Sequence, residues 1–127
     1  MHTLTPLALG LVLVVSIGQA AELITGNTLA VHCPAVLDRL DGKPLSPDAA
    51  QVASFCLGFL SGADYLHEAL TAAGSTPAYC LPREATVSHI IRVLVSYLRE
   101  HPDQAHTDGG TVALAALRDA YPCPKSR

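Results

Sequence analysis

The sequence predicts a small all-α domain held together by disulfide bonds. Apolar residues recur at helical spacing in several segments, and no segment shows the sustained alternation of a half-buried strand. The 127 residues suffice for one domain, and half of them are hydrophobic. The four cysteines form an even set in a chain that begins like an exported protein, which favours two disulfides over free thiols.

The first twenty residues are typical of a signal peptide. An apolar run from Leu7 to Ile17 precedes Gly18-Gln19-Ala20, whose small residues suit cleavage after Ala20. The run is short for a membrane-spanning helix, which needs about 20 apolar residues. Because the segment has no Lys or Arg, an uncleaved anchor or a buried helix is the alternative. We expect a signal peptide over residues 1–20, one domain over residues 21–127, a periplasmic location and no membrane contact after cleavage.

Two helices are expected on either side of a turn. The first begins with Asn27 as its N-cap and runs to Leu40, with a break or kink at Pro34. Asp41-Gly42-Lys43-Pro44 is a turn. Ser46-Pro47-Asp48 then opens the second helix with a cap, a proline and an acidic residue. One face of this helix is apolar and comprises Val52, Phe55, Cys56, Phe59, Ala63, Leu66 and Leu70.

Gly58 and Gly62 lie one turn apart inside the second helix. Each costs up to about 1 kcal/mol of helix stability relative to Ala. The pair either permits close approach of a neighbouring element or is a tolerated weakness, and the sequence leaves both alternatives open. The segment Ala73-Gly74-Ser75-Thr76-Pro77 ends the helix.

The third helix is expected to begin after Thr86, its N-cap, and to end at Pro102. Its core stripe is Val87, Ile90, Ile91, Leu94 and Leu98. Val93, Val95 and Tyr97 widen the apolar surface, so the helix is either central in the fold or packed against a second subunit. We expect these three residues to form the interface of a two-fold homodimer. A polar segment and a fourth helix over Val112–Ala120 complete the chain.

The helix order predicts the disulfide pairing. Cys33 and Cys56 lie at similar distances from the Lys43-Pro44 turn, so an antiparallel hairpin brings them level. Cys80 and Cys123 both lie beyond the open end of the hairpin formed by the third and fourth helices. We therefore predict the pairs Cys33–Cys56 and Cys80–Cys123. Zinc is disfavoured as an alternative, because zinc sites draw on closely spaced cysteines.

Composition and motifs exclude several function classes. With 8 Lys+Arg against 11 Asp+Glu the chain has no basic stripe, which argues against nucleic acid as a partner. No nucleophile, paired base or oxyanion motif is visible, so we expect no enzyme, no catalytic residue and no cofactor. His101 and His106 with Asp103 and Asp108 are expected to be solvent-exposed and not to bind metal.

An ordered set of motifs resembles the Rap/Tai family of type VI secretion amidase immunity proteins. The set comprises Gly26-Asn27, Cys33, Cys56-Leu57-Gly58-Phe59-Leu60-Ser61-Gly62-Ala63-Asp64, Tyr79-Cys80-Leu81-Pro82, Tyr97-Leu98 with His101-Pro102, Ala115-Ala116-Leu117 and Tyr121-Pro122-Cys123. The resemblance implies an exported, disulfide-bonded helical domain, usually dimeric. Its implied function is to bind a papain-like peptidoglycan amidase toxin and block the active site.

The sequence departs from this family at three places. His89 stands where we expect Gln or a similar residue to complete a capping box with Thr86. Pro34 and the Gly109-Gly110 pair leave the bounds of the first and fourth helices uncertain.

Two polar loops are the candidates for toxin contact. Residues 101–109 contribute Asp103, Gln104, His106 and Asp108, and residues 73–84 contribute Ser75, Thr76 and Arg83. The alternative for each loop is a solvated linker. His32 and His67 are expected to be structural, while Asp64 caps a helix, pairs with Arg92 or contacts the toxin. Two competing functions are a periplasmic structural or chaperone-like helical protein and, less favoured, a small hydrolase.

Overall fold

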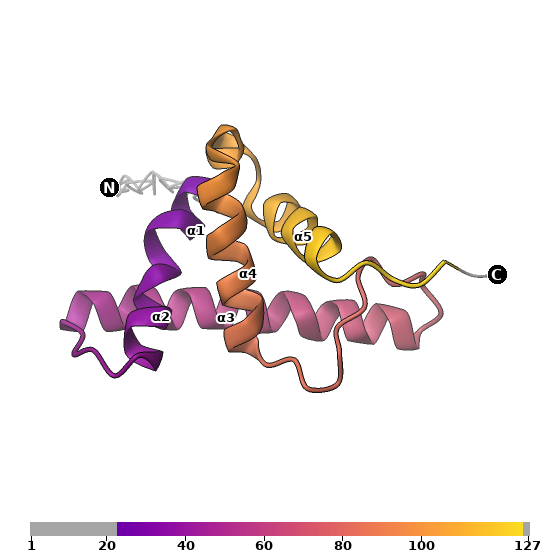
Figure 1. Cartoon of the computed structure of the whole chain (residues 1–127), viewed down its shortest axis with the longest axis horizontal. Coiled ribbons are helices and arrows are strands. Elements are labelled where there is room, and N and C mark those ends of the chain that lie inside the picture. Colours follow the sequence, from indigo (N-terminus) through magenta and orange to yellow (C-terminus); the bar gives the residue numbers. More distant parts are fainter. Residues whose placement is uncertain (1–22, 126–127) are drawn as a thin grey trace, which may run out of the picture.

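The computed structural model describes residues 23–125 and shows an all-α fold (Figure 1). Its elements are α1 (Gly26–His32), α2 (Pro34–Leu40), α3 (Pro47–Ala72), α4 (Val87–Glu100), the short 3₁₀ helix η1 (Pro102–His106) and α5 (Gly109–Ala120). No strand occurs among the described residues, which confirms the fold class. The expected signal peptide lies outside the residues that the structure describes.

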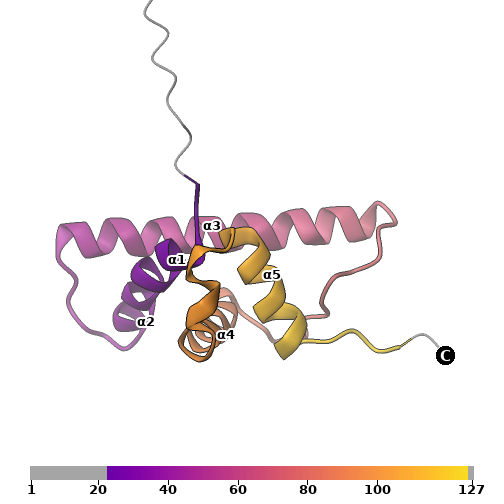
Figure 2. The same ribbon diagram turned by 90° about the horizontal axis from the view of Figure 1, so that it is seen from above.

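The helices form two unequal layers. Seen from above, the long helix α3 makes one side of the molecule by itself, and α1, α2, α4 and α5 all lie on its other side (Figure 2). The helix α4 contacts each of the other four helices and η1. One flank of α3 is therefore packed against the core while the opposite flank faces solvent along its length.

The first helix breaks at Pro34 as the sequence predicts, but it begins earlier than expected. Thr25, in extended backbone, is the N-cap, and its Oγ1 accepts a hydrogen bond from Thr28 N–H at 3.3 Å. Thr28 Oγ1 in turn accepts from Thr25 N–H at 3.3 Å. The prediction of Asn27 as the cap is wrong, because this reciprocal threonine pair satisfies the helix start and leaves Asn27 inside the helix.

The helix α3 opens as predicted, with Ser46 Oγ accepting from Ala49 N–H at 3.2 Å. The prediction of its apolar face is wrong for the second half of the helix. The residues of α3 that are buried are Ala53, Cys56 and Leu60, whereas Leu66 is 61% exposed and Leu70 is 50% exposed. A Cβ added at Gly58 or Gly62 would meet nothing within 4 Å, so no element within residues 23–125 approaches them closely.

The start of α4 shows how His89 replaces the expected glutamine. His89 Nδ1 accepts a hydrogen bond from Thr86 N–H at 3.1 Å. The ring nitrogen nearest the backbone thus supplies the acceptor of a capping box, and the helix begins after Thr86 as predicted.

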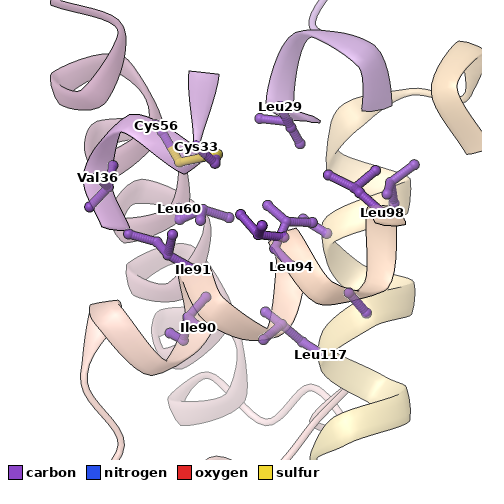
Figure 3. Close-up of a cluster of buried hydrophobic side chains, with 14 of the residues drawn as sticks. Leu29, Cys33, Val36, Cys56, Leu60, Ile90, Ile91, Leu94, Leu98 and Leu117 are labelled. Atoms are coloured by element: carbon purple, nitrogen blue, oxygen red, sulfur yellow. A yellow bond between two sulfur atoms is a disulfide. The ribbon is translucent and has the colours of Figure 1, made fainter. Parts of the chain in front are cut away.

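The wide apolar surface of α4 is covered by other helices of the same chain. Ile90, Ile91 and Leu94 are at most 1% exposed, in the middle of the core drawn in Figure 3. Val95 is only 4% exposed, so the prediction that it is a dimer contact is wrong. It packs in the core because four helices surround α4. Val93 and Tyr97 are half-buried and pack against the same core.

The two disulfides join the pairs that the helix order predicts. Cys33 and Cys56, both 0% exposed, link the α1–α2 junction to α3 inside the core (Figure 3). Cys80 and Cys123 are half-buried and link the chain after α3 to the segment after α5. The first bond is a core element and the second is a peripheral cross-link.

A backbone clasp joins the start of α1 to the start of α5. Gly26 N–H donates to Thr107 C=O at 2.9 Å, and Gly109 N–H donates to Ile24 C=O at 2.7 Å. Both glycines are needed for this approach. A Cβ at Gly26 would overlap the carbonyl of Gln104, and one at Gly109 would lie 2.8 Å from Ile24 Cγ2. The helix α5 consequently begins at Gly109, earlier than the Val112 expected.

Removing each disulfide separately should distinguish the core bond from the peripheral one. Each variant replaces both cysteines of one disulfide with alanine. The greater conformational entropy of the unfolded chain should lower the unfolding free energy by about 3–4 kcal/mol in either variant. The Cys33→Ala/Cys56→Ala variant should lose more, because it also removes two fully buried side chains. Denaturant unfolding of the two variants and the oxidised wild type measures this. Equal losses in both variants would contradict the division of roles.

Substituting the clasp glycine should destabilise the fold. Gly109→Ala places a methyl group against Ile24 and should cost about 1–3 kcal/mol of unfolding free energy. The matched control is Gly58→Ala, where the added methyl group meets open space and should increase stability by up to about 1 kcal/mol. Thermal unfolding at low protein concentration compares them. A Gly109→Ala variant as stable as the wild type would show that the clasp is not tight.

Candidate partner-binding surfaces

The loop between α3 and α4 presents an exposed tip on a fixed base. Gly74, with φ +99, turns the chain out of α3, and Ser75 N–H closes the helix end by donating to Leu70 C=O at 3.0 Å. Ser75 and Thr76 follow directly and are exposed. Neither hydroxyl forms a hydrogen bond with another described residue, so both are free to contact a partner.

The base of the loop is held on α3 by an aromatic stack. The rings of His67 and Tyr79 lie 3.9 Å apart and nearly parallel, and His67 Nε2 accepts from Ala78 N–H at 3.1 Å. Tyr79, only 4% exposed, donates its hydroxyl hydrogen to Asp64 Oδ1 at 3.0 Å. Asp64 therefore has a structural role here. Arg92, its expected partner, instead lies 3.5 Å from Asp41.

The peripheral disulfide fixes the same loop from its other side. Cys80 N–H donates to Tyr121 C=O at 2.9 Å, next to the Cys80–Cys123 bond. Figure 1 shows the segment after α5 running alongside this part of the loop. Arg83 lies further along, is exposed, and takes part in neither of the ion pairs found among the described residues. The loop thus combines cross-linked backbone with free polar side chains.

The second candidate segment is a helical turn packed on α1. Asp103 and His106 are exposed in η1, and Gln104 is half-buried. Gln104 Nε2 donates to Asp103 at 2.8 Å and its Oε1 accepts from Thr107 at 3.3 Å. Because the clasp ties the end of η1 to α1, this segment is not the projecting loop that the sequence suggested.

Asp108, the fourth candidate in this segment, has a different role. Its Oδ1 accepts from Thr111 N–H at 2.9 Å and from the Thr111 hydroxyl at 3.2 Å, capping α5. The carboxylate is thus engaged by the helix start through Oδ1, and its contact with a toxin stays a prediction.

The two candidate segments lie at opposite ends of α5 (Figure 1). Residues 101–108 precede that helix, and the loop of residues 73–84 is cross-linked to the segment that follows it. A helix of this length spans about 18 Å. Sequence reasoning treated the segments as equivalent, whereas the fold makes them separate surfaces.

A groove between α3 and α5 was not found from the sequence. It has a volume of about 330 Å³ and is open to solvent between Leu66 and Leu70 of α3 and Leu114 of α5. Leu114 is 37% exposed. Leu66 and Leu70 are apolar and recur at helical spacing. The sequence pattern therefore predicts them in the core, whereas the structure exposes them.

Neither a free thiol nor a cluster of metal-ligating side chains occurs among the described residues. The cysteines are all in disulfides, so no thiol is present as a nucleophile. Residues 23–125 contain no group of three or more His, Cys, Asp or Glu side chains arranged to hold a metal ion. No helix in that part of the chain has the length and apolar character needed to span a membrane.

A family comparison connects this fold to a function. The family model of Rap1a immunity proteins matches residues 25–123. The chain belongs to this family. No curated protein and no solved structure matches it. The matched region extends from the N-cap of α1 to the last cysteine, so membership covers all six elements and both disulfides. An immunity protein acts by binding a toxin protein, which is the role that the family assigns to this chain.

The Tyr79–Asp64 contact should make the stability of this immunity protein depend on pH at the alkaline end. Burial, and then the hydrogen bond to Asp64, raise the pKa of Tyr79 above its ordinary value of about 10. The folded protein thus retains a proton that the unfolded chain loses, so stability should fall as the pH rises above about 10. In Tyr79→Phe this part of the decrease should be absent. Unfolding free energies at pH 8 to 11 test this, and parallel curves for both proteins would contradict it.

Proposed function

We propose that this chain is a periplasmic immunity protein that binds a type VI secretion peptidoglycan amidase and occludes its active site. Membership of the immunity family over residues 25–123 is the observation that carries the proposal. The two disulfides support an oxidising compartment, since such bonds persist in the periplasm and not in the cytosol. The apolar run and small residues before Ala21 support export through a signal peptide.

The proposed inhibition is steric and needs no chemistry from the immunity protein. A cleft enzyme is blocked when a rigid segment occupies the space of its substrate. A loop already fixed in its bound shape loses little conformational entropy on docking, so a small contact can still bind tightly. The loop of residues 73–84 meets this requirement, because the His67–Tyr79 stack and the Cys80–Cys123 bond fix its base.

Within this loop, we assign toxin contact to Ser75, Thr76 and Arg83. All three are exposed and extend from cross-linked backbone. Their hydroxyl and guanidinium groups suit hydrogen bonds to the polar groups of a Cys–His active site. Asp103, Gln104 and His106 form the second candidate surface, which the length of α5 separates from the first. The alternative function is that of a periplasmic structural or chaperone-like helical protein without a cognate toxin.

The homodimer belongs to the same proposal and needs a surface other than α4. Val95 is in the core, and Val93 and Tyr97 are half-buried against it. The outer side of α4 carries polar and charged side chains, namely Ser88, His89, Arg92, Ser96, Arg99 and Glu100. The proposed assembly therefore requires an apolar face elsewhere on the molecule.

Exchanging three exposed residues of the loop should abolish protection without unfolding the protein. In a variant with Ser75→Gly, Thr76→Gly and Arg83→Ser, protection of cells that express a cognate periplasmic amidase should be lost. A few contacts commonly dominate such interfaces, each costing about 2 kcal/mol or more when truncated. The matched control is Asp103→Ser with His106→Ser, which changes exposed residues at the other end of α5.

Circular dichroism should show unchanged helix content in both variants. Loss of protection only in the Asp103/His106 variant would move the contact surface to η1. Full protection by both variants would overturn the loop assignment. Absence of protection by the wild type against all periplasmic amidases tested would favour the structural or chaperone-like alternative.

A further inference from the structure

His67 holds the loop of residues 73–84 to α3 through an atom that can take up a proton. Its Nε2 accepts the hydrogen bond from Ala78 N–H at 3.1 Å, and its ring lies 3.9 Å from that of Tyr79 and nearly parallel to it. A neutral imidazole carries one ring hydrogen, which must here be on Nδ1 because Nε2 accepts. The only ring atom left to take up a proton is therefore Nε2, the atom already bonded to the loop.

Protonation of His67 is incompatible with this bond. An imidazolium ring donates from both nitrogens and accepts at neither. The hydrogen gained at Nε2 would point at the hydrogen of Ala78 N–H, and the amide would lose its acceptor. A backbone amide without a partner costs free energy unless it reaches water. Residues 75–78 should therefore move away from α3 when the ring becomes charged.

The surroundings of the half-buried ring favour its charged form. Asp64 lies three residues before His67 on α3 and Glu68 follows it directly, and both carboxylates line one depression of the surface. The flat face of Tyr79 also attracts a cation. The α5 residues that share the groove with His67 carry no charge and comprise Gly110, Ala113, Leu114 and Leu117. The bond from Ala78 thus opposes protonation, and this bond and the proton compete for one atom.

We propose that His67 makes the affinity of this chain for its toxin depend on pH, because protonation at Nε2 releases the loop from α3 and weakens toxin binding. The inference rests on the proposed contact of the loop with the toxin. Ser75 and Thr76 lie directly before the released segment at Ala78, and both are exposed. A released tip must be ordered again on docking, and this loss of conformational entropy lowers the affinity.

The other attachments of the loop persist over the same pH range. Cys80 N–H donates to Tyr121 C=O at 2.9 Å beside the second disulfide, and neither backbone group titrates. Burial, and then the hydrogen bond to Asp64, raise the pKa of Tyr79 above its ordinary value of about 10. The tyrosine therefore keeps the hydrogen that it donates to Asp64. Acid should free the loop tip while the protein stays folded and cross-linked.

The uptake of one proton sets the size and direction of the effect. A solvated histidine takes up a proton near pH 6.5, and each pH unit below that value lowers the fraction of neutral ring by about a factor of ten. The bonded state of the loop excludes this proton, so it is favoured above about pH 6.5 and lost as the pH falls. The Kd for toxin should thus rise by up to about tenfold between pH 7.5 and pH 5.5. Solvated carboxylates titrate near pH 4, below this range.

Amide hydrogen exchange of the mature chain without toxin measures release of the loop. After correction for the intrinsic exchange rate, protection of Ala78 N–H should fall by up to about tenfold from pH 7.5 to pH 5.5. Protection of Cys80 N–H should stay constant, since its acceptor is the carbonyl of Tyr121. This comparison is made within the wild-type protein and depends on no variant.

A matched pair of variants identifies the titrating group. In His67→Gln, the side-chain oxygen replaces Nε2 with an acceptor that does not titrate, so Ala78 should remain protected at both pH values. His89→Gln is the control, because it also removes a histidine that accepts from a backbone amide and leaves glutamine to complete the capping box of α4. This control should keep the pH dependence of the wild type.

Calorimetric titration with a cognate amidase then tests the effect on toxin binding. The Kd of the wild type divided by that of His67→Gln should rise by up to about tenfold from pH 7.5 to pH 5.5. Titration of the toxin's own groups affects both proteins equally and cancels in this ratio. Constant protection of Ala78, equal pH dependence in wild type and His67→Gln, or a constant Kd ratio would overturn the proposal. A loop that opens in acid in a protein that binds no periplasmic amidase at either pH would support the role of His67 in loop release and refute the proposed function alone.

Discussion

Burial of α4 is the constraint on which the rest of the structure depends. Ile90, Ile91 and Leu94 point into a core that α1, α2, α3 and α5 must close together, since no single neighbour covers so broad an apolar surface. A domain of this size has few helices with which to cover apolar surface. It therefore buries a smaller fraction of its surface than a large domain does. Four helices are used to enclose α4, and none remains to cover the outer flank of α3. The exposed face of α3 is thus a consequence of how the core is built.

The covalent and backbone links hold this arrangement at its boundaries. Cys33–Cys56 fixes α3 to the α1–α2 junction within the core, and the clasp at Gly26 and Gly109 fixes the two helix starts at the other end of α1. Each link restricts a segment that has too little apolar surface to hold itself in place. The peripheral Cys80–Cys123 bond does the same for the loop after α3, which lies outside the main core.

These restraints bear on how an immunity protein can act by binding alone. An inhibitor that works by occlusion depends on the fit of a preformed surface. Each rotatable bond that becomes fixed on docking costs conformational entropy and so lowers the affinity. The loop of residues 73–84 has its base fixed by an aromatic stack, a buried tyrosine hydroxyl and a disulfide. Its free polar groups include Ser75 and Thr76 at the tip and Arg83 beyond the disulfide. Leu66 and Leu70 of α3 present the opposite chemistry, since they are exposed apolar side chains beside the groove to Leu114.

The sequence by itself determined the helical class, the breaks at Pro34 and after Ala73, the caps at Ser46 and Thr86, and the disulfide pairing. These depend on local rules of capping and proline geometry, and on the order of helices along the chain. The tertiary structure alone decided which side of each helix is covered. Val95 and Leu66 are both apolar residues at helical spacing, yet one is in the core and the other faces solvent. Asp108 and Asp103 are both acids in a polar segment, yet only one caps a helix. A helical pattern records that a side chain is apolar or polar, whereas its role depends on whether another element, or another molecule, lies against it.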